Sequence, residues 1–308
     1  MTQDLIGTRK GDYEILALLG VGGMGQVYKV RNVLSDRVEA MKVLLPNLAD
    51  QKMLADRFIR EIKVLAGLHH PNIAELRTAL TIDNQLVMIM EFVEGSPLSA
   101  RVQQGGIPYG QALGYIQQVL AALSYAHSQK IIHRDIKPAN MMLTPKAVVK
   151  LMDFGIARQE GDVALTTTNS TVGSIAYMSP EQVKGEPVDA RSDLYSVGVS
   201  LYELVTGQRP FQGDTGFSIM RAHLETIPKP PVELRPDLPV GISDLILMAV
   251  AKEPAKRFQS ADAFSRAISS LLPVVESTAA TVAVPPSDPT MIAPSPVGAT
   301  MAAADSSP

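Results

Sequence analysis

His133-Arg134-Asp135-Ile136-Lys137-Pro138-Ala139-Asn140 is the stretch that decides how this chain is interpreted. It places a carboxylate, a lysine and an amide in one short loop, and the apolar run that follows ends in Asp153-Phe154-Gly155. Transfer of a phosphoryl group from ATP needs a carboxylate that accepts a hydroxyl proton, a nearby cation and oxygen ligands for a metal ion. Each residue alone is more typical of a polar turn, but the ordered set predicts a phosphoryl-transfer site.

The composition narrows the classes of protein to consider. The 308 residues fit two lobes or one domain with a tail, and 46% hydrophobic residues can build a sizeable core. A balance of 28 basic and 31 acidic residues, net −3, gives no electrostatic footprint for nucleic acid or for a membrane surface. The absence of cysteine excludes disulfides, thiolate metal sites and thiol nucleophiles, and it is compatible with a reducing cytoplasm.

No targeting or membrane segment is recognisable in the sequence. The N-terminus lacks the basic-then-apolar pattern of a signal peptide, and no apolar run approaches the roughly 20 residues of a membrane helix. We therefore expect a cytoplasmic protein, or the cytoplasmic domain of a membrane protein if the chain is truncated, with no nucleic-acid partner.

A glycine-rich segment near the N-terminus, Gly20 to Gly25, lets the backbone approach a phosphate closely. Dinucleotide-binding turns share the Gly-x-Gly-x-x-Gly pattern of Gly20, Gly22 and Gly25, so a Rossmann oxidoreductase is an alternative. In that fold a helix follows the glycines. Here Gln26–Val30 alternates and is rich in β-branched residues, which favours a strand and therefore a hairpin that covers a nucleotide.

The order His-Arg-Asp-x-Lys-Pro-x-Asn followed by Asp-Phe-Gly resembles the catalytic loop and the metal-binding motif of protein kinases. Lys137 is similar to Ser/Thr rather than Tyr kinases, and the chain as a whole resembles the bacterial eukaryotic-like Ser/Thr kinases over about 12–272. The resemblance implies an α+β, bilobal fold. It places a five-stranded antiparallel sheet and one helix in 1–94, and a mainly helical lobe in 95–272.

The same resemblance assigns the catalytic and metal-binding roles. Asp135 orients the substrate hydroxyl and accepts its proton, and Lys137 neutralises the γ-phosphate. Asn140 and Asp153 hold Mg²⁺, for which Mn²⁺ is an alternative.

Lys42 lies in a strand-like segment and needs a partner, because an isolated strand lysine is usually a solvated edge residue. An apolar stripe at helical spacing over about 51–66 predicts a helix. Glu61 lies beside that stripe, at the position that kinases use for a Lys–Glu ion pair. Arg57 and Lys63 on the same helix are interpreted as its solvated face.

The resemblance also implies a nucleotide site between the glycine-rich hairpin and a hinge after Met90, the expected gatekeeper. The backbone of Glu91 and Val93 would bind the adenine edge, and Lys42 would bind the α- and β-phosphates. The ATP-binding positions are Gly20, Val21, Gly22, Gly23, Met24, Gly25, Val27, Ala40, Lys42, Glu91, Val93 and Met142.

Three structural residues follow from the same family pattern. Tyr177-Met178-Ser179-Pro180-Glu181 resembles the Ala-Pro-Glu end of the activation segment, with Ser179 in place of alanine. Glu181 is expected to pair with Arg257, and Asp193, an acid at the head of a strongly apolar helix, is expected to brace the catalytic loop.

The segment between Asp153 and Glu181 is rich in hydroxyl residues, and we expect autophosphorylation there. A phosphate pairs well with a guanidinium, and Arg134 directly precedes the catalytic acid. The candidate threonines are Thr166, Thr168 and Thr171. The alternative is that these residues only make a polar loop.

Residues 273–308 are rich in Pro, Ala, Ser and Thr, so we interpret them as a disordered tail or linker. Thr281, Thr290 and Thr300 each precede an apolar residue. Once phosphorylated, they would suit a forkhead-associated domain, whereas the simpler reading is a plain linker.

The sequence therefore predicts a Ser/Thr protein kinase that uses ATP and acts on protein substrates, with a homodimer of kinase domains as a further expectation. The alternative is a pseudokinase, a nucleotide-binding scaffold without transfer activity. Such proteins usually lack the metal-binding Asp, the strand Lys or the catalytic Asp. Asp153, Lys42 and Asp135 are all present here.

Overall fold

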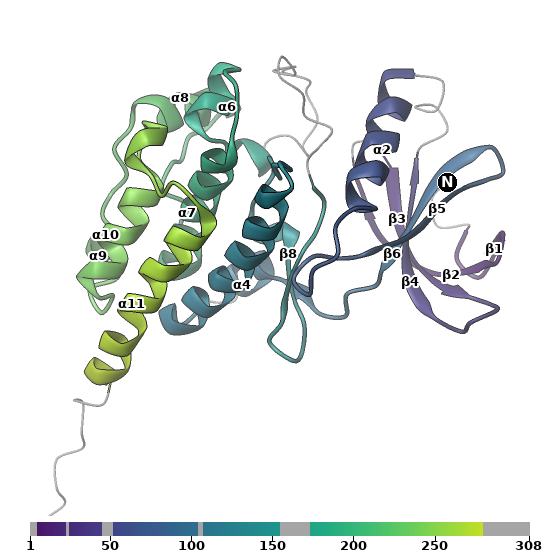
Figure 1. The fold of residues 1–308 in the computed structure, drawn as a ribbon, viewed down its shortest axis with the longest axis horizontal. Coiled ribbons are helices and arrows are strands. Elements are labelled where there is room, and N and C mark those ends of the chain that lie inside the picture. The colour runs from purple at the N-terminus through teal and green to yellow at the C-terminus, as the bar shows by residue number, and fades with distance from the viewer. Residues whose placement is uncertain (1–4, 23–24, 45–51, 104–106, 155–172, 280–308) are drawn as a thin grey trace, which may run out of the picture.

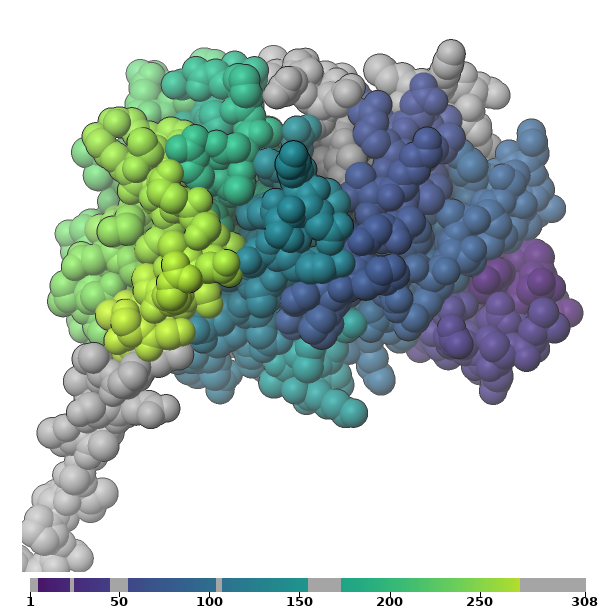
Figure 2. Space-filling view, in the orientation of Figure 1, coloured from purple at the N-terminus to yellow at the C-terminus, as the bar shows by residue number. Residues whose placement is uncertain are grey.

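The computed structural model describes residues 5–22, 25–44, 52–103, 107–154 and 173–279. Two lobes lie side by side (Figure 1): an antiparallel sheet with one helix on the N-terminal side, and a bundle of helices on the C-terminal side. The predicted α+β, bilobal architecture is confirmed. Figure 2 shows that the blue part of the N-terminal lobe borders the teal part of the C-terminal lobe in this view.

The N-terminal sheet has the strand order β1-β2-β3-β4-β6-β5, and every neighbouring pair is antiparallel. It contains the five predicted strands and adds a two-residue strand, β1, at one edge. Helix α2 (Lys52–Leu65) accompanies the sheet, and the predicted helix at 51–66 is thereby confirmed. The strands are β1 (Arg9–Lys10), β2 (Tyr13–Val21), β3 (Gly25–Asn32), β4 (Val38–Leu44), β5 (Leu76–Ile82) and β6 (Gln85–Glu91).

The glycine-rich segment forms a hairpin, because β2 pairs with β3 in antiparallel register from Tyr13↔Asn32 to Val21↔Gln26. A strand and not a helix follows Gly25, so the prediction that excluded a Rossmann turn is confirmed. Gly25 is required sterically, since a Cβ there would lie 2.3 Å from the carbonyl oxygen of Val43 on β4. A second hairpin joins β5 and β6 through Asp83 and Asn84, both with positive φ, as a type I′ turn requires.

The C-terminal lobe is built around helix α7 (Ala190–Thr206), most of whose residues are buried. A small sheet of β7 (Ser96–Pro97), β8 (Met141–Leu143) and β9 (Val149–Leu151) lies between the bundle and the other lobe. The other helices are α3 (Leu98–Gln103), α4 (Tyr109–Ser128), α6 (Pro180–Lys184), α8 (Gly216–Glu225), α9 (Pro231–Leu234), α10 (Val240–Ala249) and α11 (Ala261–Ala279), with 3₁₀ turns η1 (Pro138–Asn140) and η2 (Pro254–Lys256).

The predicted start of the disordered tail at 273 is wrong, because α11 continues to Ala279. The change in composition at Pro273 does not end the helix. The remaining tail, 280–308, lies outside the described residues. Within the described ranges, no helix is both long and apolar enough to span a bilayer.

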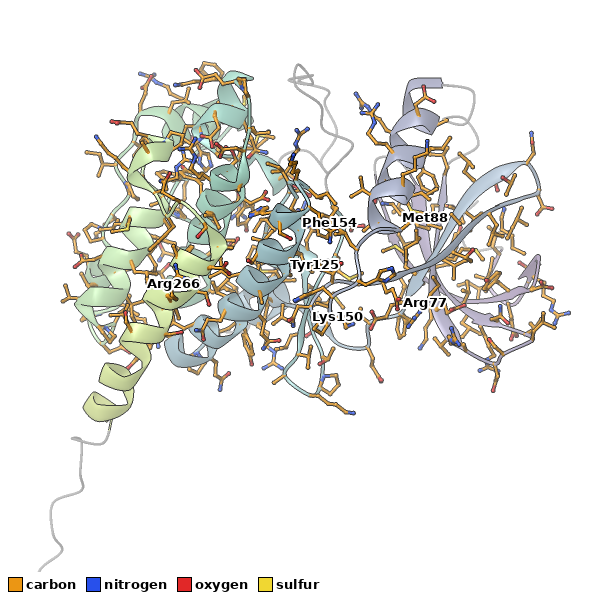
Figure 3. The ribbon with its side chains drawn as sticks, viewed as in Figure 1. Arg77, Met88, Tyr125, Lys150, Phe154 and Arg266 are labelled. Atoms are coloured by element: carbon orange, nitrogen blue, oxygen red, sulfur yellow. The ribbon has the colours of Figure 1, made fainter. Side chains whose placement is uncertain are left out.

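The connection between α2 and β5 fastens the two lobes together. The side-chain Nδ2 of Asn72 donates to the backbone carbonyl of Val149 on β9 at 2.8 Å. The backbone carbonyl of Asn72 accepts a hydrogen bond from the N–H of Leu151 at 2.8 Å. The backbone N–H of His69 donates to the hydroxyl of Tyr125 on α4 at 3.0 Å. Tyr125, Lys150 and Phe154 all lie in this central region of the molecule (Figure 3).

Gly198 lies at a close contact between α7 and α10. A Cβ at this position of α7 would lie 2.6 Å from the Cβ of Ala249 on α10. Gly114, in the interior of α4, has no neighbour within 4 Å of such a Cβ and serves as a matched control.

We expect Gly198→Ala to lower the free energy of unfolding by about 1–3 kcal/mol, because the helices must separate. Gly114→Ala should raise it by about 0.5–1 kcal/mol, since alanine loses less backbone entropy on folding. Urea titrations of both variants measure the difference. Equal stability of the two variants would contradict a tight α7–α10 contact.

Candidate active site

The catalytic loop is held by one buried carboxylate, that of Asp193 on α7, which is 1% exposed. It accepts hydrogen bonds from the backbone N–H groups of His133 (2.9 Å) and Arg134 (2.8 Å). His127 Nε2, at the end of α4, lies 2.8 Å from the same carboxylate. Two aligned backbone donors fix the loop where Arg134 takes a positive φ of 67°, a strained conformation for a residue with a side chain.

The side chain of His133 links the catalytic loop to the segment that ends in Asp153-Phe154. Its Nδ1 accepts from the N–H of Asp135 (3.2 Å), and its Nε2 lies 3.0 Å from the carbonyl of Met152, so the neutral ring carries its proton on Nε2. Its ring packs on Phe154 with a centroid distance of 4.5 Å. Burial lowers the pKa of His133, which keeps it neutral. The two segments of the predicted site are thus joined through this imidazole.

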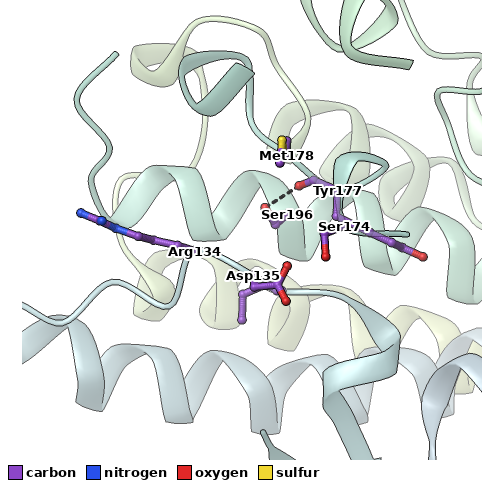
Figure 4. Close-up of a pocket in the computed structure, with 7 residues that line it drawn as sticks. Arg134, Asp135, Ser174, Tyr177, Met178 and Ser196 are labelled. Atoms are coloured by element: carbon purple, nitrogen blue, oxygen red, sulfur yellow. Dashed lines mark hydrogen bonds between the residues drawn. The ribbon is translucent and has the colours of Figure 1, made fainter. Parts of the chain in front are cut away.

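The carboxylate of Asp135 lies near Ser174 in the close-up of the site (Figure 4). Lys137 Nζ lies 2.7 Å from Asp135 Oδ2 and 2.7 Å from Ser174 Oγ, so one ammonium joins the acid to the segment beyond the activation loop. Asn140 Nδ2 donates to the carbonyl of Asp135 (2.8 Å) and to its Oδ2 (3.1 Å). Asp135, Ser174, Tyr177 and Met178 lie around one point of the site.

Lys42 and Glu61 form the predicted ion pair, with Lys42 Nζ 2.7 Å from Glu61 Oε1. Asp153 Oδ1 lies 3.5 Å from the same ammonium. Burial lowers the pKa of Lys42, but the carboxylates of Asp153 and Glu61 outweigh burial and leave the pKa raised. Burial raises the pKa of Glu61 by more than Lys42 lowers it. Lys42 is therefore a permanent cation, with Glu61 buried behind it.

Asn140 and Asp153 offer the hard oxygen ligands that Mg²⁺ prefers. Because the Asn140 amide nitrogen is held by Asp135, its carbonyl oxygen is oriented away from that acid and is available to a metal ion. Asp153 is about half exposed and takes a positive φ of 48°, which turns its carboxylate out of the chain direction. These donors fit Mg²⁺ held jointly with nucleotide phosphates. No cluster of three or more His, Asp or Glu ligands occurs among the described residues.

The residues predicted to line an adenine slot come from both lobes. Ala40, Met90 and Val93 are buried in one apolar cluster, and the partly buried Val27 and Met142 pack against it. At the hinge, Lys150 Nζ lies 2.8 Å from the carboxylate of Glu91, and the N–H of Glu91 donates to Glu75 O at 2.8 Å.

The glycine-rich hairpin is described on both sides of its tip. Gly20 and Val21 end β2, Gly22 N–H donates to Gly25 O at 2.8 Å, and a Cβ on Gly20 would meet nothing within 4 Å. This open face leaves room for a phosphate. Gly23 and Met24 lie outside the described residues, as do the candidate phosphorylation sites Thr166, Thr168 and Thr171.

Glu181 and Arg257 form the predicted pair, bidentate at 2.7 and 2.8 Å. Ser192 Oγ also donates to Glu181, at 2.6 Å, and the guanidinium reaches the carbonyls of Ala251 and Lys252. Burial alone raises the pKa of Glu181, but the hydrogen bonds from Arg257 and Ser192 outweigh burial and leave the pKa lowered. This buried ion pair fastens the end of the substrate-side segment to the C-terminal lobe.

Three contacts were missing from the sequence interpretation: His127 with Asp193, Lys150 with Glu91, and Gln182 Nε2 with Arg134 O at 3.0 Å. His127 could have been singled out, because it lies only six positions before His133. Nothing in the sequence pairs Lys150 or Gln182 with its partner.

Comparison with known proteins places these features in a family. Residues 13–267 match the protein kinase domain model. The chain is 40% identical over 266 residues to the serine/threonine-protein kinase PknJ of Mycobacterium tuberculosis, covering 84% of this chain and 45% of that protein. It is 36% identical over 260 residues to the serine/threonine-protein kinase PrkC of Bacillus subtilis, covering 84% and 40%. The chain spans less than half the length of these relatives.

The fold is also similar to solved structures. The crystal structure of the Mycobacterium tuberculosis PknI kinase domain matches with a TM-score of 0.67 and 30% sequence identity. The match covers 86% of this chain and 98% of that one.

We expect Arg257→Met to lower the free energy of unfolding by about 3–5 kcal/mol near pH 7, because it leaves a buried carboxylate unpaired. The lowered pKa of Glu181 stabilises the wild type above the unfolded pKa of about 4.3, and this contribution is lost as the pH falls through the folded pKa. The difference between wild type and variant should therefore shrink as the pH falls below about 4.3.

Urea titrations at several pH values measure this difference. Arg221→Met removes an exposed pair with Glu225 and should leave stability nearly unchanged. A pH-independent loss in Arg257→Met would contradict the assigned role of the Glu181 carboxylate.

Proposed function

The chain belongs to the protein kinase family, and from this membership we propose that it is an active Ser/Thr kinase that transfers the γ-phosphate of ATP to hydroxyls of protein substrates. The observation that carries the proposal is the joint placement of two groups of side chains. Asp135, Lys137 and Asn140 lie within hydrogen-bonding distance of one another, and Lys42 contacts both Glu61 and Asp153.

In the proposed reaction, Asp135 orients the substrate hydroxyl and accepts its proton as the oxygen attacks the γ-phosphorus. The bond from the γ-phosphorus to the β–γ bridging oxygen breaks, and ADP leaves with the electron pair. Lys137 lies 2.7 Å from Asp135, where it can neutralise charge on the transferred group. Lys42, held by Glu61, binds the α- and β-phosphates.

Asn140 and Asp153 would hold Mg²⁺, or Mn²⁺ in its place, and the bound cation supplies charge neutralisation to the phosphates. The residues of the chain do the positioning. Asp193 fixes the catalytic loop through the N–H groups of His133 and Arg134, so that Asp135 is presented without reorganisation.

A pseudokinase scaffold is the second candidate from the sequence, and no observation favours it. Purified chain with Mg-ATP should transfer labelled phosphate to itself or to a basic carrier protein. Nucleotide binding without any transfer would instead support the scaffold.

Protein substrates follow from the proposed activity, and the cytoplasm is the proposed compartment because ATP is available there. The activation segment is the first proposed substrate, with Thr166, Thr168 and Thr171 as acceptors and Arg134 as the phosphate partner. Transfer between two copies would need the proposed homodimer of kinase domains.

The tail is the second proposed substrate. Thr281, Thr290 and Thr300 are tethered to the active site, and a short flexible tether raises their effective concentration to about millimolar. The phosphorylated tail would present ligands to a forkhead-associated domain.

We expect Lys42→Met to keep the fold but to lower the transfer rate about a hundredfold or more, because it removes a cation positioned on phosphate. Lys63→Met, which removes an exposed charge from α2, is the matched control and should retain full activity. Initial rates of labelled-phosphate transfer, with circular dichroism to verify folding, measure both variants. Near-wild-type rates in Lys42→Met would contradict the assignment of Lys42 as a phosphate-binding cation.

We expect phosphate on threonines of both the activation segment and the tail in the wild type, and none in Asp135→Asn. A chain that ends at Ala279 keeps α11 whole and should lose only the tail phosphates and capture by a forkhead-associated domain. Mass spectrometry of the three proteins maps the sites. An active enzyme with an unmodified activation segment removes the first proposed substrate, and an unmodified tail leaves it a linker.

A further inference from the structure

His223 on α8 is a buried polar side chain that the proposed mechanism does not use. It is 0% exposed, and its ring packs against Phe211 and Tyr195 with centroid distances of 4.7 and 5.8 Å. Its Nδ1 lies 2.9 Å from the hydroxyl of Tyr195 on α7. One ring nitrogen is therefore partnered inside the C-terminal lobe.

The other nitrogen, Nε2, has no hydrogen-bond partner among the described residues. Burial, with the charge of Lys252, lowers the pKa of His223 to about 4, so the ring is neutral and carries one proton near pH 7. If Nδ1 held that proton, Nε2 and the hydroxyl hydrogen of Tyr195 would both lack partners. The Tyr195 hydroxyl therefore donates to Nδ1, and Nε2–H is a buried donor without an acceptor, which is costly.

The ring of His223 also lies near the backbone of the segment beside the catalytic acid. The backbone of Ile175 and Ala176 lies near enough to raise the pKa of the ring, although no aligned hydrogen bond forms. Ile175 and Ala176 also pack against Ile219, one turn earlier on α8. Ser174, which directly precedes them, accepts a hydrogen bond from Lys137 at 2.7 Å.

Of the backbone groups of Ile175 and Ala176, only the carbonyl oxygens can accept a hydrogen bond from Nε2–H. A small movement of the segment 174–178 would complete this hydrogen bond. The segment 174–178 also lies beside Asp135, the acid that the proposed reaction directs at the phosphoacceptor (Figure 4). A hydrogen bond from His223 would therefore stabilise one position of the segment 174–178 relative to others.

We propose that His223 is a positioning residue for the protein substrate, whose Nε2–H bonds a backbone carbonyl of Ile175 or Ala176 when the phosphoacceptor is bound. The bond holds the segment 174–178 against α8 and so places the hydroxyl for Asp135. This inference rests on the proposed kinase function, because it assigns His223 to the substrate side of that same site.

Two substitutions separate the ring nitrogens. The amide nitrogen of His223→Gln reaches about as far as Nε2 and keeps that donor, whereas His223→Asn reaches only the Nδ1 position and keeps the contact with Tyr195. With myelin basic protein as substrate, we expect His223→Asn to raise the KM for protein about tenfold, the effect of one buried hydrogen bond. The KM for ATP and kcat should stay within about twofold, and His223→Gln should remain near wild type.

The full chain is used throughout, with thermal unfolding to verify folding and intact mass to match the phosphorylation state of the variants. Equal KM values for Asn and Gln, or a parallel rise in the KM for ATP, would overturn the proposal. Absence of transfer by the wild type would instead overturn the kinase function itself.

A second readout does not depend on transfer or on the variants. The chain has five histidines, so ¹⁵N-histidine labelling gives few signals, and His223 is assigned by the signal that His223→Gln loses. We expect the Nε2–H tautomer in the free chain and a downfield shift of that proton when myelin basic protein is added. A ring protonated on Nδ1, or an unmoved signal, would show that His223 is only part of the core.

Discussion

The buried carboxylate of Asp193 is the constraint on which the catalytic site depends. A carboxylate that is 1% exposed must have its oxygens satisfied, and here the donors are two successive N–H groups of the catalytic loop and the ring of His127. These hydrogen bonds offset the energetic cost of the positive φ of Arg134. With the backbone in this conformation, the next residue, Asp135, lies toward Lys137 and Ser174. The need to satisfy the buried carboxylate of Asp193 thus fixes the position of Asp135.

The parts of this fold that the sequence predicts are those fixed by local chemistry or by paired functional groups. The hairpin at Gly20–Gly25 follows from alternation and glycine, and α2 follows from an apolar stripe at helical spacing. A strand lysine needs a partner, and the resemblance to kinases identified Glu61 as the partner of Lys42. The resemblance to kinases then supplied the long-range partners Glu181 and Arg257.

Other features depend on tertiary packing that no local pattern encodes. Helix α11 continues past Pro273 because cooperative helix formation outweighs the local change in composition. The contact of His127 arises where α4 packs on α7, and that of His223 joins α8 to α7. A histidine on a helix face is usually a core residue or a solvated one. The hinge pair of Lys150 and Glu91 joins strands from two sheets, so neither strand predicts it alone.

The bidentate contact between Glu181 and Arg257 also has a consequence for biosynthesis. The two residues are 76 positions apart, and everything from α6 to η2 lies between them. A growing polypeptide emerges N-terminus first, so the sheet, α2 and the catalytic loop leave the ribosome well before Arg257 does. Closure of so long a loop must wait for its second end. A nascent chain therefore has the sheet, α2 and the catalytic loop outside the ribosome before the segment that ends at Glu181 can be anchored by Arg257, and translation itself delays the completion of the fold.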